Sequence, residues 1–461
     1  MANSKPNIII SLPLVWSIRN FILSGICDQL SKKYNLYYVF EVNNKITIDY
    51  YISDEKSKIV LDKFQNIDWL FIILKKVFSL KFPQLDYIND IMEKGGIGDK
   101  RFTGSNLMKD ILFNKIAQIV YHFKLFFILE QIWFFLCSKK QRDNVKKTIL
   151  EINPQFILST TVVVSFEWNL IVLAKRNKIP IYTHILSFDN ITSRGYIPIS
   201  NINKFFVWNG YMKSELIKYY NISSELIHIT GTPQFDFHKQ VEFYLNLNDV
   251  QSSIGLESNQ KYIVYCSNHY FHTPNEPELV EDIICSLSVD SKLKDYRLVL
   301  RLHPLDDYAR WDELIKNNLG KVILSIPWKH PNKDNTSIGL VSKGDLITFV
   351  NLLKYASVIL NIASTITIDA AMVNTPSICI GFHSNNKLES KCYYDYHFSE
   401  HFKKIIEFES SPIVLNMESL IEHILSSVEF PELLENSRKK LADFYFPIQN
   451  GSSSFELLNL L

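Results

Sequence analysis

The feature that most constrains the fold is a repeated alternation of short apolar runs with helix-forming segments. The first run, Asn7 to Leu12, contains Ile-Ile-Ile. A helical pattern follows from about Arg19 to Lys33, and a second apolar run covers Asn35 to Phe40. Short, fully apolar runs are typical of parallel strands that are buried on both faces. This strand–helix–strand order predicts an α/β fold with a doubly wound parallel sheet.

The alternation stops between about residues 56 and 150 and then resumes. Residues 56–150 have mostly helical periodicity, which predicts a helical insertion in the first domain. Further strands are expected at 156–160, 180–186, 205–208 and 226–230, and then at 262–267, 296–302, 321–326, 357–362 and 376–380. The 461 residues allow more than one domain. We expect an N-terminal domain over 1–240, a C-terminal domain over 259–440, and a last segment, 441–461, that crosses back to the first domain.

Composition narrows the possible partners. Lys plus Arg (49) nearly equals Asp plus Glu (48), so no global field favours nucleic acid. The six cysteines are scattered without a CxxC pair, which argues against a disulfide framework or a structural zinc site. The N-terminus lacks the basic region and long apolar core of a signal peptide, so we expect a cytoplasmic protein. Only 14 glycines occur, and a phosphate site would therefore be built from side chains and helix N-termini.

One long apolar stretch, Ile111 to Cys137, lies inside the expected insertion. A spanning helix needs about 20 predominantly apolar residues. Charged residues interrupt or flank the stretch here: Lys115, Lys124, Glu130, Lys139, Lys140 and Arg142. They favour a core helix or helix pair packed against the sheet. A face lying on a membrane surface and a true membrane span remain as alternatives.

Polar residues stand where two of the expected strands end. Arg301-Leu302-His303-Pro304 closes the strand at 296–302, and Ser364-Thr365 follows the strand at 357–362. Ligands of open parallel sheets bind at the carboxyl ends of the strands. A guanidinium, an imidazole and two hydroxyls in that position predict a phosphate or diphosphate site.

The spacing within this motif adds detail. Pro304 biases His303 toward an extended backbone, and Arg301, two residues earlier, is expected on the same side of the strand. A protonated His303 could act as an acid on a leaving phosphate, whereas a neutral one could only orient it. The alternative is a structural role in which Arg301 and His303 pair with Asp306 or Asp307.

Three residues after the strand at 357–362 could likewise either contact a ligand or have a purely structural role. Ser364 and Thr365 could contact a ligand or cap the next helix, and both roles are compatible. Asp369, one helical turn later, could reach a ribose hydroxyl or face solvent.

These motifs, taken in order, resemble a known family. The strand–Arg-Leu-His-Pro–strand–Ser-Thr–Asp arrangement resembles the nucleotide-binding half of GT-B glycosyltransferases of bacterial surface polysaccharides. It is also similar to CDP-glycerol glycerophosphotransferases and to sialyl- and Kdo-transferases with a His-Pro motif. Ser187 to Gly195 (SFDNITSRG) resembles the S-[WF]-D-N-x-T-S-[KR]-G segment of surface-carbohydrate biosynthesis proteins. Later landmarks of such proteins match at Val207-Trp208-Asn209, at Thr230 to Asp236 and at Gln449 to Ser454.

The resemblance implies two Rossmann-like domains that face each other across a cleft. The N-domain would bind the acceptor and the C-domain the nucleotide-sugar donor, with Gly231 and Thr232 in a tight loop near the donor. Retaining enzymes of this fold often carry two Glu eight positions apart. Asn361 and Asp369 stand at the corresponding positions here, which favours direct inversion.

Inversion needs a base near the acceptor hydroxyl. Asp189 and Glu167 are the candidates, and each could instead be structural, since Asp-Asn favours turns. Further candidates for the cleft are Arg19, His184, Arg194 and His269. No acidic cluster stands in a convincing metal setting, so we expect no metal and no cofactor, with helix dipoles, Arg301 and His303 offsetting the leaving-group charge.

The sequence therefore predicts a glycosyltransferase that uses a CMP-, UDP- or CDP-linked donor and a glycan or lipid-linked acceptor. It would act in the cytoplasm, with peripheral contact to the cytoplasmic face of the inner membrane as an option. Two alternatives stay open. One is a CDP-polyol phosphotransferase, and the other is a non-catalytic scaffold that binds a nucleotide sugar.

Overall fold

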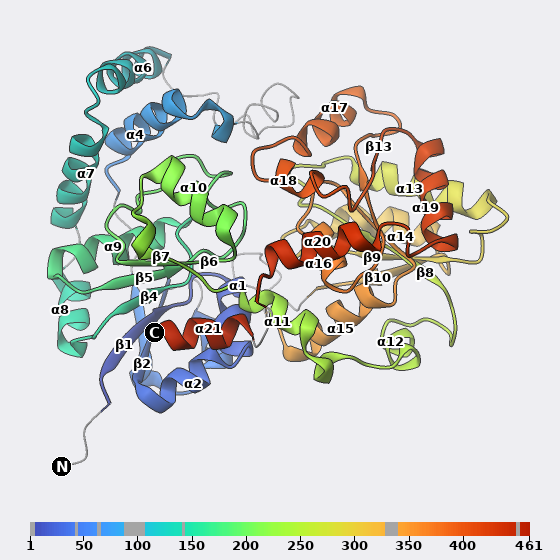
Figure 1. The fold of residues 1–461 in the computed structure, drawn as a ribbon, viewed down its shortest axis with the longest axis horizontal. Helices are drawn as coiled ribbons and strands as arrows, with labels where there is room; N and C mark the ends of the chain where they lie inside the picture. Colours follow the sequence, from blue (N-terminus) through green and yellow to red (C-terminus); the bar gives the residue numbers. More distant parts are fainter. Residues whose placement is uncertain are drawn as a thin grey trace.

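The computed structural model describes residues 5–41, 45–61, 66–86, 107–140, 143–327, 340–448 and 452–461. Two parallel sheets, each covered by helices, lie side by side in the molecule (Figure 1). The predicted class of two Rossmann-like, doubly wound domains is confirmed.

The first sheet has seven parallel strands in the order β3-β2-β1-β4-β5-β6-β7. The strands are β1 (Asn7–Ser11), β2 (Asn35–Glu41), β3 (Lys58–Leu61), β4 (Ile157–Ser159), β5 (Ile181–His184), β6 (Lys204–Val207) and β7 (Ile227–Ile229). The chain order reverses between β1 and β4, where Ile9 pairs with Ile157. This reversal is the switch point at which open sheets bind ligands.

The second sheet has six parallel strands in the order β10-β9-β8-β11-β12-β13. They are β8 (Tyr262–Cys266), β9 (Arg297–Arg301), β10 (Val322–Ser325), β11 (Val358–Asn361), β12 (Ser377–Ile380) and β13 (Ile413–Val414). Every residue of β8 and β11 is buried, as expected for central strands covered on both faces. The switch point of this sheet lies between these two strands.

Helices of the first domain differ from the sequence prediction in one place. The helix expected from 19 to 33 is divided into α1 (Val15–Ile18), a π-helix (Arg19–Leu23) and α2 (Ile26–Lys33). Gly25 separates the last two with a φ of 80°, a left-handed conformation that glycine adopts without steric cost. The other helices outside the insertion are α3 (Lys45–Tyr51), α9 (Ser165–Asn177), α10 (Gly210–Tyr220) and α11 (Pro233–Lys239).

The insertion forms a helical layer on one side of this domain. It contains α4 (Asp68–Lys81), α6 (Leu107–His122), α7 (Phe126–Lys140) and α8 (Asp143–Ile152). The edge strand β3 also falls within it, and the prediction of a mostly helical segment did not include that strand. Parts of the predicted insertion, including Arg142, lie outside the described residues.

The apolar stretch Ile111 to Cys137 is a helix pair broken at Lys124, whose φ is 55°. Its inner face, with Ala117, Trp133 and Cys137, is fully buried. Within the described ranges, none of the helices combines the length and apolarity that a bilayer crossing demands.

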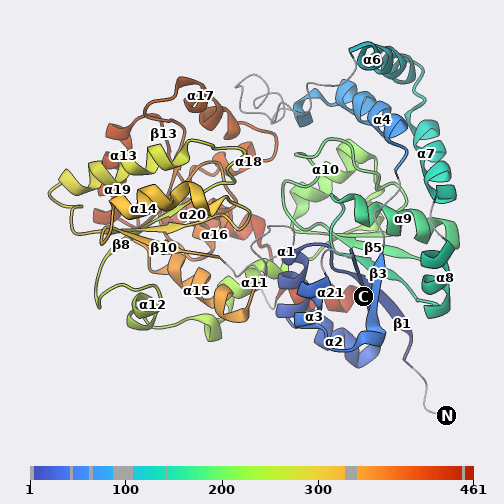
Figure 2. The same cartoon turned by 180° about the vertical axis from the view of Figure 1, so that it is seen from behind.

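The second domain is covered by α12 (Leu247–Ser253), α13 (Glu276–Val289), α14 (Asp312–Asn317), α15 (Lys343–Lys354), α16 (Ile366–Met372), α17 (Lys387–Tyr396), α18 (Lys403–Ile406), α19 (Met417–Glu429) and α20 (Glu435–Tyr445). Short 3₁₀ turns occur at Glu55–Ser57, Pro83–Asp86, Ser224–Leu226, Val241–Phe243 and Tyr308–Trp311. The last helix, α21 (Ser453–Leu460), returns to the first domain and packs against α2 and α11 (Figures 1 and 2).

Candidate active site at the domain boundary

Three histidines gather at neighbouring strand ends of the second sheet. His269 follows β8 and His303 follows β9, with ring centroids 5.9 Å apart, and the ring of His272 lies 6.3 Å from that of His269. All three side chains are partly exposed. The carboxyl edge of this sheet therefore presents an accessible imidazole cluster next to the switch point.

Backbone hydrogen bonds fix the protonation of two of these rings. The N–H of Phe271 donates to Nδ1 of His269, and the N–H of Leu305 donates to Nδ1 of His303, each at 3.1 Å. In a neutral ring these bonds assign the proton to Nε2. Burial, with added repulsion from His269, His272 and Arg310, lowers the pKa of His303 to about 3. In the unliganded protein His303 is therefore neutral near pH 7, and its ring offers Nε2–H as a hydrogen-bond donor.

A buried ionic network holds the loops that carry the histidines. Nη2 of Arg310 lies 2.8 Å from Oε2 of Glu276 and 2.9 Å from Oδ2 of Asp306. Both carboxylates also accept backbone N–H groups, from Asn268 at 3.1 Å and from Tyr270 at 2.9 Å. These bonds tie the segments after β8 and β9 together, so the network positions the imidazole cluster.

The acidic neighbours considered for Arg301 and His303 have other partners. Asp306 binds Arg310, while Asp307 accepts the N–H of Ala309 at 3.2 Å and caps a 3₁₀ turn. Neither acid therefore pairs with Arg301 or His303, and the sequence did not predict Arg310 as the partner of Asp306.

Arg301 has different surroundings from His303. Its Nη1 donates to Oγ of Ser325 at 3.0 Å and to the carbonyl of Ile326 at 3.3 Å, and its guanidinium lies 5.4 Å from the ring centroid of Phe349. Only 8% of Arg301 is exposed. Arg301 thus belongs to the β9–β10 packing, and the prediction that it shares a phosphate contact with His303 is not supported by these contacts. Pro304 is partly exposed beside His303.

The Ser364-Thr365 segment forms a tight turn at the end of β11. Ala363 has a φ of 42°, and its N–H donates to Nε2 of His397 at 3.3 Å. The N–H of Ser364 donates to Oδ1 of Asn361 at 3.1 Å. Backbone strain of this kind often occurs at functional sites. The side chain of Thr365 makes no capping bond to α16, and the hydroxyls of both Ser364 and Thr365 are partly exposed.

Asp189 lies in the first domain, in the loop that follows β5. Its carbonyl accepts the N–H groups of Thr192 and Ser193, and its Oδ2 accepts Oγ–H of Ser193 at 2.7 Å. Burial alone would raise its pKa. The charges of His401 and Arg194 more than offset that effect, so the pKa of Asp189 lies below its ordinary value. Asp189 is a partly exposed, ionised carboxylate.

His401 is the residue that sequence reasoning missed. It stands between α17 and α18 of the second domain, and its ring lies 5.8 Å from that of Phe188, next to Asp189. Burial lowers its pKa, and Asp189 partly offsets the effect. The pKa of His272 is lowered to about 4 by burial and by positive neighbours that include Arg194 and His401. The ring contact between His401 and Phe188 thus places the second domain against the Asp189 loop of the first.

Glu167, the second predicted base, is fully buried. Its Oε1 accepts a hydrogen bond from Ser11, and burial raises its pKa to about 8. His184 is also fully buried, edge-on to Phe21, and burial lowers its pKa to about 4. Neither side chain reaches the partly exposed site, so we do not carry Glu167 forward as a base.

The raised pKa of Glu167 predicts a pH effect on stability. The ordinary pKa of 4.5 becomes about 8 in the fold, so the folded state holds the proton more tightly. The tighter binding of this proton adds to the stability of the folded state. This added stability is complete below about pH 4.5 and is lost as the pH rises through about 8. Wild type should lose up to about 1.4 kcal/mol per pH unit in this window relative to Glu167→Gln, which is neutral at every pH. Urea unfolding of both proteins near pH 6 and near pH 8 measures the difference, and parallel stability curves would contradict the assignment.

Asp369 contributes to a contact between the domains. Its Oδ1 lies 3.1 Å from Nε2 of His238 and 3.5 Å from Nε2 of Gln234, both on α11. Gln234 in turn accepts from Nη2 of Arg19 at 2.6 Å. Asp369 is 3% exposed. The structure thus replaces both options for Asp369, a ribose or solvent, with contacts to α11.

Gly231 lies against the C-terminal segment of the chain. A Cβ on Gly231 would lie only 3.1 Å from Ile448 and would also overlap Ser453, so glycine is needed for the C-terminal segment to pass. Asp236 accepts the N–H groups of Ser453 and Ser454 at 2.7 and 2.9 Å. The motif at 230–236 therefore anchors the start of α21, and a role of Gly231 and Thr232 near the donor stays a prediction. Residues 449–451 of the other matched motif lie outside the described residues.

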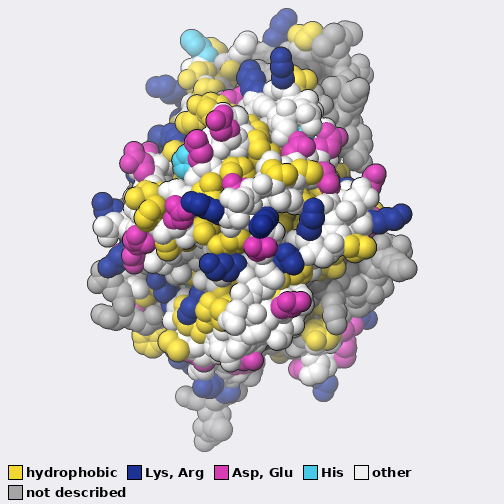
Figure 3. Space-filling view, turned by 90° about the vertical axis from the view of Figure 1, so that its right-hand side faces the viewer, with side chains coloured by type: hydrophobic (Ala, Val, Ile, Leu, Met, Phe, Trp, Pro, Cys, Tyr) yellow, Lys and Arg dark blue, Asp and Glu magenta, His cyan; other side chains and the backbone are white. Residues whose placement is uncertain are grey.

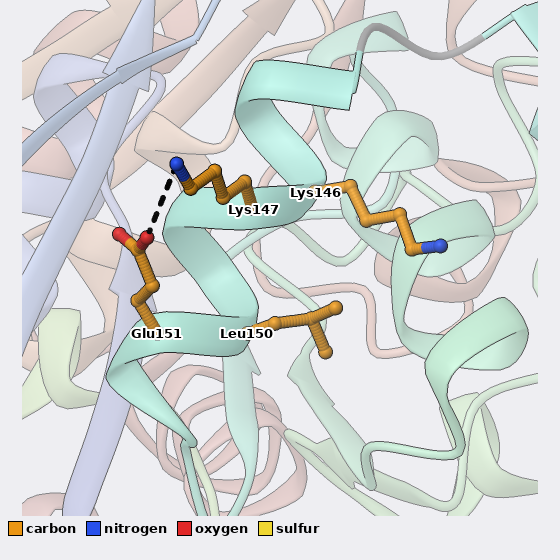
Figure 4. Close-up of a pocket in the computed structure, with 4 residues that line it drawn as sticks. All are labelled: Lys146, Lys147, Leu150 and Glu151. Carbon is orange, nitrogen blue, oxygen red and sulfur yellow. Dashed lines mark ion pairs between the residues drawn. The ribbon is translucent and has the colours of Figure 1, made fainter.

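A surface hollow on α8 lacks the features of the site at the strand ends. The one in Figure 4 is lined by Lys146, Lys147, Leu150 and Glu151 of α8, with Lys147 and Glu151 paired at 3.8 Å. It involves one helix face and no strand ends. Among the described residues, no group of three or more His, Cys, Asp or Glu side chains could hold a metal ion.

Comparison with known proteins identifies the fold. No family model matches the chain, and no curated protein matches its sequence.

Solved structures do match. UDP-GlcNAc 2-epimerase from Neisseria meningitidis bound to UDP-GlcNAc has a TM-score of 0.53 at 13% identity, covering 99% of each chain. The Methanocaldococcus jannaschii enzyme in complex with UDP-GlcNAc and UDP has a TM-score of 0.52 at 13% identity, covering 99% of each chain. S. aureus MnaA with UDP has a TM-score of 0.52 at 11% identity, covering 98% of this chain and 95% of that one. The chain therefore has the GT-B fold, in which two Rossmann-like domains, here with seven and six parallel strands, face each other.

Proposed function

We propose that this protein is a glycosyltransferase that moves a sugar from a nucleotide-activated donor to a saccharide or lipid-linked acceptor, with inversion and without a metal or other cofactor. The observation that carries the proposal is the two-sided site at the domain boundary. Neutral imidazoles and hydroxyls lie on the side of the second domain, and an ionised carboxylate lies on the side of the first. Such a site suits a reaction between two separately bound substrates.

On the donor side, Nε2–H of His303 and the hydroxyls of Ser364 and Thr365 would bind the diphosphate. His303 follows β9, whereas Ser364 and Thr365 follow β11, and these two strands flank β8. Asn268, just after β8, donates from Nδ2 to the carbonyl of Ile362 at the end of β11 at 2.7 Å. Hydrogen bonds to an ionised acceptor are stronger than neutral ones. They would stabilise the negative charge that grows on the leaving nucleotide.

On the acceptor side, the Asp189–His401 pair would remove the proton of the acceptor hydroxyl. The acceptor oxygen then forms a bond to the anomeric carbon while the bond from that carbon to the donor phosphate oxygen breaks. The proton goes to the pair, and the electron pair leaves with the nucleotide. The negative charge of Asp189 raises the pKa of His401, and a positive charge on His401 lowers the pKa of Asp189, so each residue would favour the charged form of the other during proton transfer.

A different reaction class is favoured by the fold relatives. The two solved structures from Neisseria meningitidis and Methanocaldococcus jannaschii are UDP-GlcNAc 2-epimerases, which suggests epimerisation of a UDP-linked sugar as the second candidate. Product analysis separates the possibilities when the protein is incubated with UDP-linked sugars and a panel of glycan and lipid-linked acceptors. A new glycosidic linkage supports the proposal, and a 2-epimer formed without an acceptor supports the rival. A phosphodiester formed from a CDP-polyol would indicate a phosphotransferase. Tight donor binding without any product would indicate a scaffold.

Replacing His303 by alanine tests the donor side. Losing a hydrogen bond to a charged group costs roughly 1.5–3 kcal/mol, so kcat/KM for the donor should fall at least about tenfold. Since the pKa of His303 is about 3, donor binding by wild type should show no step from this residue near pH 6.5. Steady-state kinetics and calorimetric donor binding provide the measurements.

The control for this variant is His423→Ala. His423 lies on α19, where its Nδ1 bonds the carbonyl of Ser419 of the same helix at 2.8 Å. It should retain wild-type kinetics. Equal kinetics for His303→Ala and wild type would refute the donor assignment.

A further inference from the structure

The outer surface of α6, α7 and the corner between them is unusually apolar for a water-exposed surface. Of the 32 exposed large hydrophobic side chains in the described part of the chain, ten fall between Ile111 and Phe135. We call this the α6–α7 face. Soluble monomers rarely expose contiguous apolar patches of more than a few hundred Å². The concentration of such residues in one segment of the chain therefore indicates an interaction surface.

The two most exposed of these side chains, Phe123 and Phe127, lie at the corner between α6 and α7, with Leu125 between them. Phe123 is 65% exposed, Leu125 40% and Phe127 64%, around the left-handed turn at Lys124. The N–H of Leu125 bonds the carbonyl of Val120 at 2.9 Å, which fixes the corner. Two aromatic rings and a leucine thus project from a rigid turn between two helices.

The outer side of α7 continues this surface. Ile128, Ile132 and Phe135 are spaced four and three residues apart, which places them on one helical stripe, and they are 56, 44 and 57% exposed. Lys139 completes the stripe, with its Nζ 4.3 Å from the ring centroid of Phe135. The opposite side of α7 carries the buried Trp133 and Cys137, so the exposed stripe is not needed for packing.

The charge on this surface has a single sign. Between 111 and 140 the exposed charged side chains are Lys115, Lys124, Lys139 and Lys140. The acidic residue of that range, Glu130, is 4% exposed, and its Oε1 accepts from Tyr196 at 2.6 Å. By contrast, the surface of the second domain in Figure 3 mixes Lys and Arg with Asp and Glu.

We propose that the α6–α7 face binds the surface of an anionic lipid bilayer. The corner at Phe123–Phe127 enters the acyl boundary, and the lysines contact the headgroups. An apolar side flanked by cations is the combination that holds helices at such an interface, and each lysine near an anionic surface adds to binding. A second copy fits less well, because a symmetric contact would bring the lysines of the two copies together.

This location suits the rest of the molecule. In Figures 1 and 2 the helices α4, α6 and α17 lie at the same end, so both domains reach toward the side that carries the face. The inference does not depend on the proposed reaction, since it rests on the exposure and charge of the insertion.

Flotation with vesicles tests the inference on the full-length protein. Wild type should float with phosphatidylcholine vesicles that contain phosphatidylglycerol, should float less with phosphatidylcholine alone, and should be released by salt. Phe123→Ser/Phe127→Ser should weaken the partition at least about tenfold, since each ring loses apolar burial. Lys124→Glu/Lys139→Glu should lose the preference for the anionic lipid.

A matched control removes exposed apolar side chains elsewhere. Phe430 and Leu433, between α19 and α20, are 54 and 68% exposed, and Phe430→Ser/Leu433→Ser should float like wild type. Circular dichroism checks that every variant is folded. Failure of wild type to float, or equal flotation of Phe123→Ser/Phe127→Ser, would overturn the inference. A concentration-dependent dimer that this variant dissolves, without vesicle binding, would assign the face to a second copy.

Discussion

Replacing Asp189 by asparagine is expected to lower kcat by about 10²- to 10⁴-fold, the range that general base catalysis contributes. The asparagine keeps the size of the side chain and one acceptor oxygen but removes the negative charge that favours a protonated His401. A proton taken up by the pair would then be stabilised less. Donor binding should change little, because the donor groups lie in the other domain.

Initial rates at saturating donor, together with calorimetric donor binding, separate the two effects. Asp312→Asn, at the exposed first residue of α14, is the matched control and should behave as wild type. If Asp189→Asn retained full activity, or lost donor binding in proportion to rate, Asp189 would be removed from the reaction.

Replacing Arg310 by methionine should destabilise the second domain by roughly 3–5 kcal/mol. The variant leaves the carboxylates of Glu276 and Asp306 buried without their cation, and both side chains are completely inaccessible. The loops after β8 and β9 should loosen, so donor binding should weaken as well. Urea unfolding followed by circular dichroism measures the loss of stability.

An exposed ion pair provides the comparison. Lys292 and Glu429 form a contact in which both side chains are well exposed, and Lys292→Met should cost less than about 1 kcal/mol. Arg310→Lys, which retains the charge without the planar fork, should fall between the two. A loss below about 1 kcal/mol for Arg310→Met would show that the network does not hold these loops.

The sequence predicted most strands because a buried parallel strand needs a short, wholly apolar run. The same rule explains the two omissions. β3 lies at the edge of its sheet and begins at Lys58, and β13 has only two residues, so neither leaves a strong local pattern. The break at Gly25 was missed for a related reason, since apolar periodicity continues across it.

Position along a strand was enough to predict where four candidate side chains lie, whereas their roles in ligand binding stay predictions. His269, His303, Ser364 and Thr365 all follow strands, and all stand partly exposed at one edge of the second sheet. Arg301 shows the limit of this reasoning. The position of Arg301 on one side of its strand did not show whether its guanidinium would contact Ser325 or a ligand.

By itself, the sequence determined the parallel α/β architecture and the strand ends that carry polar groups, because both depend on hydrophobic periodicity and local backbone preference. The tertiary structure decided which distant residues meet. It placed Asp369 against His238, Ser453 against Gly231 and His401 beside Asp189. Those contacts arise when helices and loops from separate parts of the chain pack together. No local pattern encodes that geometry, and for this reason the position of His401 against the Asp189 loop could be seen only in the folded molecule.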